Sequence, residues 1–241
     1  MGDASVKRAP LYLLALAVVI GFIALGRWQL QRATFKEHLI AQSALVLDRR
    51  VPVALAAAND IDANDFVWVA GEGRFLAQPA LLLDNQTRAG QHGVRIYRLF
   101  QPEVSRRPLL VELGWRPLPP QRTLPHEPTL DGRYRLQGLL APPPSPGLAI
   151  GAADQLQADG SHLLTRIDIG VLAKSLALPG GLAPRVLRLD PALKLGYARD
   201  LEILANTLPP ARHRGYAVQW FALAATVGVI ALYFMFRRKP A

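Results

Sequence analysis

Two long segments without a charged residue, one near each end of the 241-residue chain, constrain the fold more than any other feature. The first covers residues 9–26 (APLYLLALAVVIGFIALG) and the second covers residues 215–236 (GYAVQWFALAATVGVIALYFMF). As α-helices that rise ~1.5 Å per residue, both are long enough to cross a hydrocarbon layer of ~30 Å. The sequence therefore predicts two transmembrane helices, with the rest of the chain between them.

The net charge of +10 is concentrated beside these segments. Residues 37–208 hold 18 Lys or Arg against 17 Asp or Glu, whereas 10 cations and one anion flank the apolar segments. This distribution is typical of membrane anchoring and argues against a nucleic-acid partner. Because Lys7, Arg8 and residues 237–239 place cations in the short tails, we expect both termini in the cytoplasm of a bacterium. The central domain is then expected in the periplasm, held by the inner membrane.

The first segment has an alternative interpretation as a cleavable signal peptide, but no small-x-small cleavage site follows it. Instead, residues 28–47 keep a helix-forming composition without Gly or Pro, so we expect the first helix to run on out of the membrane. The expected organisation is a tail (1–8), a transmembrane helix (9–28), a helical stalk (29–47), a periplasmic domain (48–210), a second transmembrane helix (211–236) and a tail (237–241).

The central segment has the pattern of a mainly β domain. Short runs rich in Val, Leu, Ile, Tyr and Trp are separated by turn residues and prolines, and several alternate apolar with polar positions, which favours an antiparallel sheet. Asp168 is positioned to cap one short helix, from Ile169 to Leu176. The expected fold class is a membrane protein of the α+β type, in which two transmembrane helices flank an antiparallel, mainly β domain. The strand candidates are FVWVAGEGRF, ALLLDNQT, GVRIYRLFQP, PLLVELGWRP, YRLQGLLA, HLLTRIDI and PRVLRLD.

No motif for catalysis is found in the sequence. Cysteine is absent, which removes disulfides, iron–sulfur clusters and Cys-type zinc sites, and no G-x-S-x-G, phosphate-binding or H-E-x-x-H motif occurs. Copper delivery is disfavoured because the only thioethers are Met1 and Met235. We therefore expect no enzyme, although a cluster of Asp84, Arg88 and His92 would be the place to look for an acid/base site.

His213 differs from the other four histidines because it stands at the mouth of the second apolar segment, in ARHRGYAVQWFALAA. On a helix, Tyr216 and Trp220 lie on the same side as His213. An imidazole at the water edge with aromatic surface below it suits axial ligation of haem iron, with Arg212 or Arg214 paired to a propionate. The alternative is an ordinary aromatic belt at the membrane interface.

Each apolar segment has a glutamine near its outer end, Gln29 at the first segment and Gln219 in the second. If the two helices pack antiparallel, Gln29 and Gln219 both lie near the outer surface, where they bond to each other, to a ligand or to interfacial water.

Four stretches of the sequence resemble the Surfeit locus family of cytochrome c oxidase assembly factors, in the same order over nearly the whole chain. They are GRWQLQRATFKEHLI, LLLDNQTRAGQHGVRIYRLFQP, LLVELGWRP and HRGYAVQWFALA. The most specific motifs are G-x-W-Q-x-x-R, at Gly26, Trp28, Gln29 and Arg32, and H-x-x-Y-A-x-Q-W-F, at His213, Tyr216, Ala217, Gln219, Trp220 and Phe221.

The resemblance implies a non-catalytic factor that helps to insert haem a into the large subunit of a haem–copper oxidase. The partners would be that subunit, the haem a synthesis machinery and membrane lipid. In bacterial relatives the His of the second motif is associated with haem a binding, which falls on His213. One departure is Leu113 before Gly114 and Trp115, where family members commonly have Arg-Gly-Trp, which indicates a divergent branch.

The leading hypothesis is thus a haem a chaperone without turnover. The expected iron ligand is His213, and the other expected cofactor-binding residues are Trp28, Gln29, Arg212, Arg214, Tyr216, Gln219 and Trp220. A structural assembly factor that never touches haem is the second hypothesis, and substitution of His213 would then be silent. A periplasmic enzyme on two anchors is the third.

Overall fold

The computed structural model describes residues 9–60, 65–144, 151–204 and 207–237. The tail expected at 1–8 and most of the tail expected at 237–241 lie outside these residues. The chain divides into two compact units. One unit consists of residues 1–41 and 207–241, and the other of residues 42–206.

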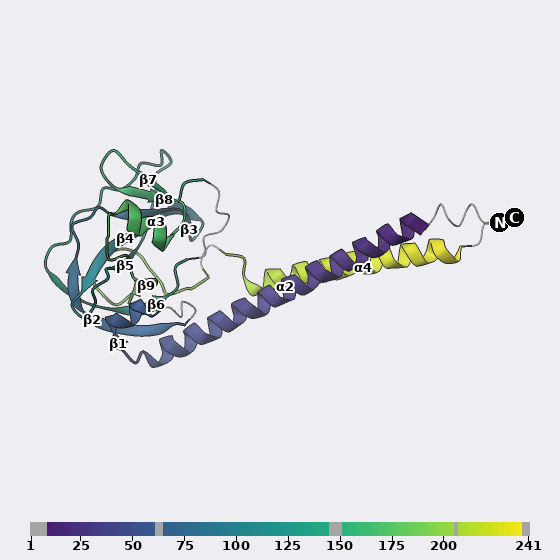
Figure 1. Cartoon of the computed structure of the whole chain (residues 1–241), viewed down its shortest axis with the longest axis horizontal. Coiled ribbons are helices and arrows are strands. Elements are labelled where there is room, and N and C mark those ends of the chain that lie inside the picture. The colour runs from purple at the N-terminus through teal and green to yellow at the C-terminus, as the bar shows by residue number, and fades with distance from the viewer. Residues whose placement is uncertain (1–8, 61–64, 145–150, 205–206, 238–241) are drawn as a thin grey trace. The chain divides into compact units, whose positions relative to one another are not determined.

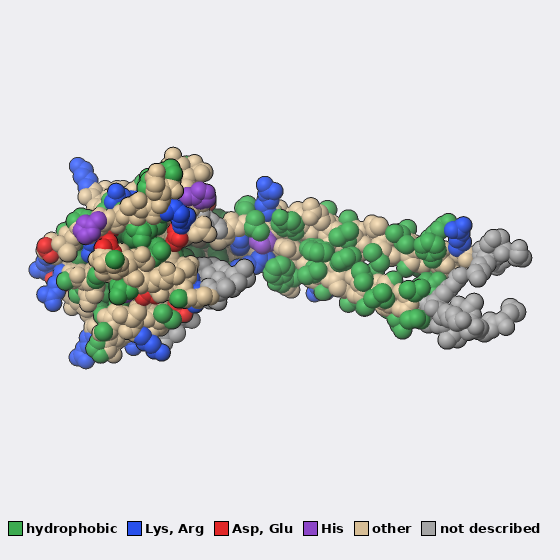
Figure 2. Space-filling model, turned by 90° about the horizontal axis from the view of Figure 1, so that it is seen from above, with side chains coloured by type: hydrophobic (Ala, Val, Ile, Leu, Met, Phe, Trp, Pro, Cys, Tyr) green, Lys and Arg blue, Asp and Glu red, His purple; other side chains and the backbone are tan. Residues whose placement is uncertain are grey.

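The first unit contains two long helices, α2 (Ala9–Arg49), which continues into the second unit, and α4 (Pro210–Phe236). Pro210 stands in the first turn of α4, where its fixed φ fits the helix and its missing N–H costs nothing. By length and composition, both helices are able to cross a membrane, which is consistent with a membrane protein. Figure 2 shows hydrophobic side chains over much of the visible face of this unit. The division of α2 into a spanning part and a stalk stays a prediction.

The second unit is built on one nine-stranded sheet, ordered β1-β2-β6-β9-β5-β4-β3-β8-β7 (Figure 1). Its strands are β1 (Val53–Ala54), β2 (Val67–Phe75), β3 (Leu81–Arg88), β4 (Gln91–Pro102), β5 (Leu109–Pro117), β6 (Arg133–Ala141), β7 (Asp154–Leu156), β8 (His162–Leu164) and β9 (Val186–Leu189). A 3₁₀ helix, η1 (Leu55–Asn59), follows β1, and α3 (Ile169–Ser175) precedes β9.

Part of the sheet closes on itself. The end of β2 pairs with β4 as well as with β6, so that β2, β6, β9, β5 and β4 form a closed ring of paired strands. The closure brings backbones very close at Gly73, where a Cβ atom would lie 2.2 Å from the carbonyl oxygen of Gln101. Only glycine fits this position without displacing the strands.

Hydrophobic residues form two separate clusters in this unit. One cluster includes Val69, Val94, Phe100, Val111 and Leu187, all almost completely buried. The other packs α3 against the sheet through residues that include Leu81, Tyr97, Leu110, Leu172 and Leu176. The sheet is therefore covered on both sides, which explains why its central strands have few exposed positions.

The expectation of an antiparallel sheet is wrong in part, because the sheet is mixed. The pairs β1–β2, β3–β8 and β5–β9 are parallel, and the other pairs are antiparallel. All seven strand candidates contain a strand, but HLLTRIDI is extended only at residues 162–164 and the short strands β1 and β7 were not predicted. The short helix α3 is confirmed, and the side chain of Asp168 accepts a hydrogen bond from the backbone N–H of Val171.

Candidate site in the helix pair

The two helices of the first unit pack side by side and run in opposite directions. We call residues 9–41 of α2, together with α4, the helix pair (Figure 1). The ring centroids of Phe22 and Trp220 lie 5.5 Å apart, and a Cβ atom at Gly26 would lie 2.6 Å from the ring of Phe221. Glycine therefore allows the helices to approach closely at this level, as small residues do between membrane helices.

His213 is buried between the helices, with 6% of its surface exposed. Its Nδ1 atom lies 2.7 Å from Oε1 of Gln29. An amide oxygen only accepts hydrogen bonds, so Nδ1 carries the ring proton and Nε2 keeps a free lone pair. This Nε2 is buried and has no hydrogen-bond partner among the residues that the structure describes. An imidazole whose second nitrogen is fixed in this way is the usual arrangement of a metal-binding histidine.

Cations surround this histidine. Lys36, which is 5% exposed, donates a hydrogen bond to the carbonyl oxygen of Leu208, just before α4 begins. Arg32 lies one turn before Lys36 on the same helix. Arg214 is exposed and forms an ion pair with Glu37 at 2.9 Å. The level of His213 is therefore rich in positive charge with one carboxylate.

The ion pair between Glu37 and Arg214 defines one flank of the helix pair, called here the Glu37 flank. Successive residues of an α-helix are roughly 100° apart. Arg32 then lies roughly 140° around α2 from Glu37, and Arg212 lies roughly 160° around α4 from Arg214. Both therefore belong to the opposite flank, called here the Arg32 flank.

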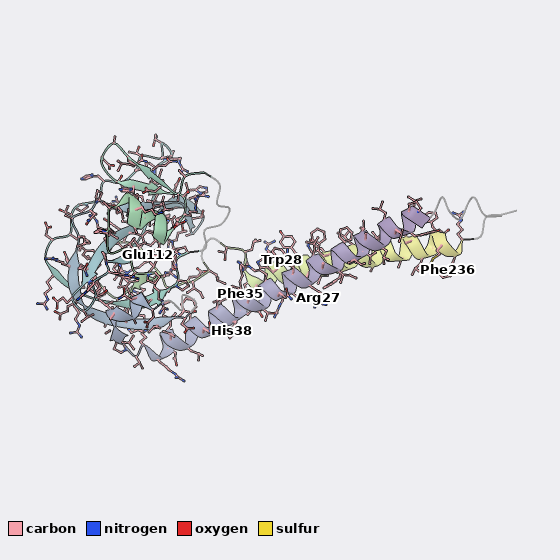
Figure 3. The ribbon with its side chains drawn as sticks, viewed as in Figure 1. Arg27, Trp28, Phe35, His38, Glu112 and Phe236 are labelled. Atoms are coloured by element: carbon pink, nitrogen blue, oxygen red, sulfur yellow. The ribbon has the colours of Figure 1, made fainter. Side chains whose placement is uncertain are left out.

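Several expected site residues gather on the Arg32 flank. Trp28 is within roughly 40° of Arg32, while Tyr216 and Gln219 are within roughly 40° of Arg212. All three are exposed, and Trp28, labelled in Figure 3, exposes 55% of its surface. Trp220 is half-buried against Phe22 at the helix contact. Arg214, by contrast, is on the Glu37 flank.

Gln29 contacts His213, so one of the alternatives weighed for the two glutamines, a bond between Gln29 and Gln219, is not what the structure shows. Sequence reasoning missed Phe22 and Lys36 as neighbours of the site. Phe22 has a usable signal, because it lies seven residues before Gln29 on the same helical face. Lys36 has none, since a lysine on a helix is exposed more often than buried.

The chemistry of His213 fits a metal bound through one nitrogen, as in haem, where four ligands come from the macrocycle. No group of three or more His, Asp and Glu that would hold a bare metal ion occurs in the described parts of the chain. Because Nε2 is covered in the closed helix pair, ligation requires the side chains around His213 to move.

In the second unit, the residues considered for an acid/base cluster are each engaged elsewhere. Asp84 binds the guanidinium of Arg122 with both oxygens, at 2.7 and 2.8 Å. Arg88 pairs with Asp200 at 3.3 Å, and His92 faces the hydroxyl of Thr87. No side-chain hydrogen bond or ion pair joins two of these three residues in the described part of the chain.

Glu112 on β5, labelled in Figure 3, is almost completely buried, with 3% of its surface exposed. It accepts hydrogen bonds from Arg95 at 2.5 Å and from Arg188 at 3.2 Å, and the hydroxyl of Tyr97 lies 3.4 Å away. These donors come from β4 and β9, the two strands beside β5. Glu112 therefore ties three strands together, and each of its two oxygens has a donor.

The fold and the site define a class of protein: a β domain joined to a pair of apolar helices, with a buried histidine between those helices whose Nε2 has no partner among the described residues. The sequence model of the SURF1 family matches residues 16–225 of the chain, which include most of α2, the first part of α4 and the whole domain. The chain belongs to the SURF1 family, whose members are assembly factors associated with cytochrome oxidase and are not known as catalysts. No curated protein matches the chain.

Proposed function

We propose that the protein binds haem a at the helix pair, with His213 as the axial ligand of the iron, and aids its insertion into the large subunit of a cytochrome oxidase. The observation that carries the proposal is the buried Nε2 of His213, which lacks a partner among the described residues while Gln29 fixes the proton on Nδ1. Membership of the SURF1 family supports the link to oxidase assembly.

Each part of the helix pair has a role in this proposal. Gln29 holds the imidazole in the tautomer that presents a lone pair, and a bound haem would supply an open coordination position on its iron. Trp28, Tyr216 and Trp220 supply aromatic surface beside the ligand, and Gln219 supplies a polar group at the same flank. Arg212 supplies a guanidinium for a carboxylate, whereas Arg214 is occupied by Glu37.

The domain is proposed to lie in the periplasm of a bacterium, with the helix pair in the inner membrane and both termini in the cytoplasm. The support is the short basic tails and the even number of candidate spans. A cytoplasmic reporter fused after Ala241 should stay active in cells, and so should a fusion before Met1. Activity of a periplasmic reporter at either end would contradict this orientation.

The proposal is tested in cells that lack the chromosomal gene and carry a plasmid copy. Wild type should restore the haem a content of the purified oxidase, and His213→Ala should restore little of it. His38→Ala is the matched control, because His38 is exposed on the same helix pair and should behave like wild type.

A structural assembly factor that never binds haem is the second candidate. In that case His213→Ala restores as much haem a as wild type does, provided that both proteins are present in equal amounts in the membrane. Equal restoration would therefore refute the haem-binding role and leave the family's general role in oxidase assembly.

A further inference from the structure

The Arg32 flank carries positive charge that the described residues leave unbalanced. Arg32 and Arg212 have no carboxylate partner in the described part of the chain, and Lys36 is bonded to a backbone carbonyl oxygen. The guanidinium carbon of Arg32 lies over the ring of Phe35, 5.3 Å from the ring centroid. A cation–π contact does not neutralise the guanidinium, which keeps its charge and its N–H donors for another partner.

The Glu37 flank is different, because Arg214 is neutralised there by Glu37 at 2.9 Å. Arg27 lies roughly 140° around α2 from Arg32 and so does not share its flank. The excess charge beside His213 is therefore confined to one side of the helix pair.

Arg32 and Arg212 also stand at nearly the same level as His213. The bond between Gln29 and His213 fixes the two antiparallel helices against each other. Arg32 is three residues after Gln29 and lies about 5 Å further along α2, while Arg212 is one residue before His213 and lies about 1.5 Å away along α4. Because the helices are antiparallel, both displacements are in the same direction. Two arginines thus stand near the level of the imidazole, one on each helix, both within one helical turn of it.

We propose that Arg32 and Arg212 form a clamp for two carboxylates of the ligand that His213 binds, namely the two propionates of haem. The inference rests on the proposed haem-binding function and goes beyond it by assigning the arginines that bind the propionates. Arg212 takes a propionate, Arg32 takes the other, and Arg214 takes none because Glu37 already occupies it. Guanidinium groups suit this task because their N–H groups match the two oxygens of a carboxylate.

Charge complementarity supports the clamp. Two propionates bring two negative charges to a flank where Arg32, Arg212 and Lys36 bring three positive ones. The two pairs would balance most of this positive charge. They would lie near the start of α4, where haem carboxylates would meet water. A bound haem would also be held in one orientation, because contacts to two carboxylates and to the iron restrict its rotation.

The test compares ferric haem b with its dimethyl ester, which has the same macrocycle and no propionate charge. Both are titrated into haem-free, full-length protein in a neutral detergent at low salt, and the Soret difference spectrum gives each dissociation constant. Wild type should bind the diacid about 10-fold to 100-fold more tightly than the ester, as expected for hydrogen bonds between charged groups.

Arg32→Gln and Arg212→Gln should each reduce this preference several-fold, and the double variant should bind both forms equally. Arg27→Gln is the matched control. It removes an exposed cation of the same helix that has no carboxylate partner among the described residues, and it should keep the full preference. Circular dichroism spectra that match wild type show that the variants fold.

A double variant that keeps the wild-type preference overturns the clamp, and so does a wild type that binds diacid and ester equally. In either case His213-dependent binding would still support the proposed function. If His213→Ala leaves the affinity for both forms unchanged, the proposed function fails, and the clamp fails with it.

Discussion

Replacement of Glu112 by Gln removes the negative charge that pairs with both Arg95 and Arg188. Arg95 then has no ion-pair partner among the described residues, and Arg188 keeps only Asp200, at 3.9 Å. The side chains are almost completely enclosed, with exposed fractions of 4% for Glu112, 9% for Arg188 and 13% for Arg95. Breaking such a buried pair by removing one partner costs about 3–5 kcal/mol. Because the amide oxygen of Gln still accepts one hydrogen bond, we expect about 3 kcal/mol, the lower end of this range.

The assay is urea unfolding of the full-length protein in detergent, followed by tryptophan fluorescence. In a background with Trp28→Phe and Trp220→Phe, the remaining fluorescence comes from Trp68 and Trp115, both buried in the domain. With a slope of about 2 kcal/mol per molar urea, a loss of about 3 kcal/mol lowers the unfolding midpoint by about 1.5 M.

Glu72→Gln is the matched control, because Glu72 pairs with Arg133 on the surface, with exposed fractions of 42% and 65%. Exposed pairs contribute about 0–1 kcal/mol, so the midpoint should fall by less than about 0.5 M. The reasoning is refuted if Glu112→Gln shifts the midpoint no further than Glu72→Gln does.

Three other changes test separate features of the structure. Burial, followed by the neighbouring charge of Glu112, raises the pKa of Tyr97 well above its usual value of about 10. Neutral Tyr97 therefore contributes to the free energy of unfolding fully below about pH 10, and this contribution is lost as the pH rises further. Tyr97→Phe should reduce the decrease of the urea midpoint at alkaline pH, and an unchanged decrease would contradict this. Gly26→Leu should place a side chain against Phe221 and destabilise the helix pair by about 1–3 kcal/mol, which lowers the thermal unfolding midpoint followed by Trp220 fluorescence. Gly21→Leu is the control and should leave this midpoint unchanged, because a Cβ atom at Gly21 has nothing within 4 Å. Ala89→Asn should stabilise the β3–β4 turn by about 1 kcal/mol in the urea assay, since φ is 48° at Ala89 and 77° at Gly90; destabilisation would refute that turn geometry.

Local sequence patterns were sufficient to find most elements of the fold. The uncharged runs at both ends lie in long helices, and Asp168 caps the helix that it was expected to cap. Short runs rich in Val, Leu, Ile, Tyr and Trp located seven strands, several of which alternate apolar with polar positions because side chains of a strand point to opposite faces in turn. The same alternation carries no information about strand direction. The parallel pairing of β5 with β9, which are separated in the sequence by β6, β7, β8 and α3, could therefore not be predicted from it.

The site was predicted in part for a similar reason. His213 was singled out by its place at the start of the second apolar segment, and Gln29 by its place near the end of the first. That Gln29 lies against His213 and not against Gln219 depends on how the two helices are rotated, which neither segment alone determines. Which residues of the two helices share a flank can be assigned only once the ion pair between Glu37 and Arg214 is known.

The burial of Leu113 explains why this chain can have Leu where members of the family commonly have Arg before Gly-Trp. Its side chain is 3% exposed and belongs to the hydrophobic cluster that contains Val111 and Leu187. An apolar residue is stable there because no charge has to be buried. The neighbouring Trp115 donates a hydrogen bond from its indole N–H to the carbonyl oxygen of Gln86 at 3.0 Å, which connects β5 to β3.

The most direct test of the central claim is the optical spectrum of the detergent-purified protein after co-expression with the enzymes of haem a synthesis. Wild type and His38→Ala should show the Soret and α bands of haem a, and His213→Ala should lose them. Gln29→Leu should retain haem about 10-fold to 100-fold more weakly, as expected when the group that orients a ligating histidine is removed. Haem a bands of equal intensity in wild type and His213→Ala, or none in wild type, would contradict the account.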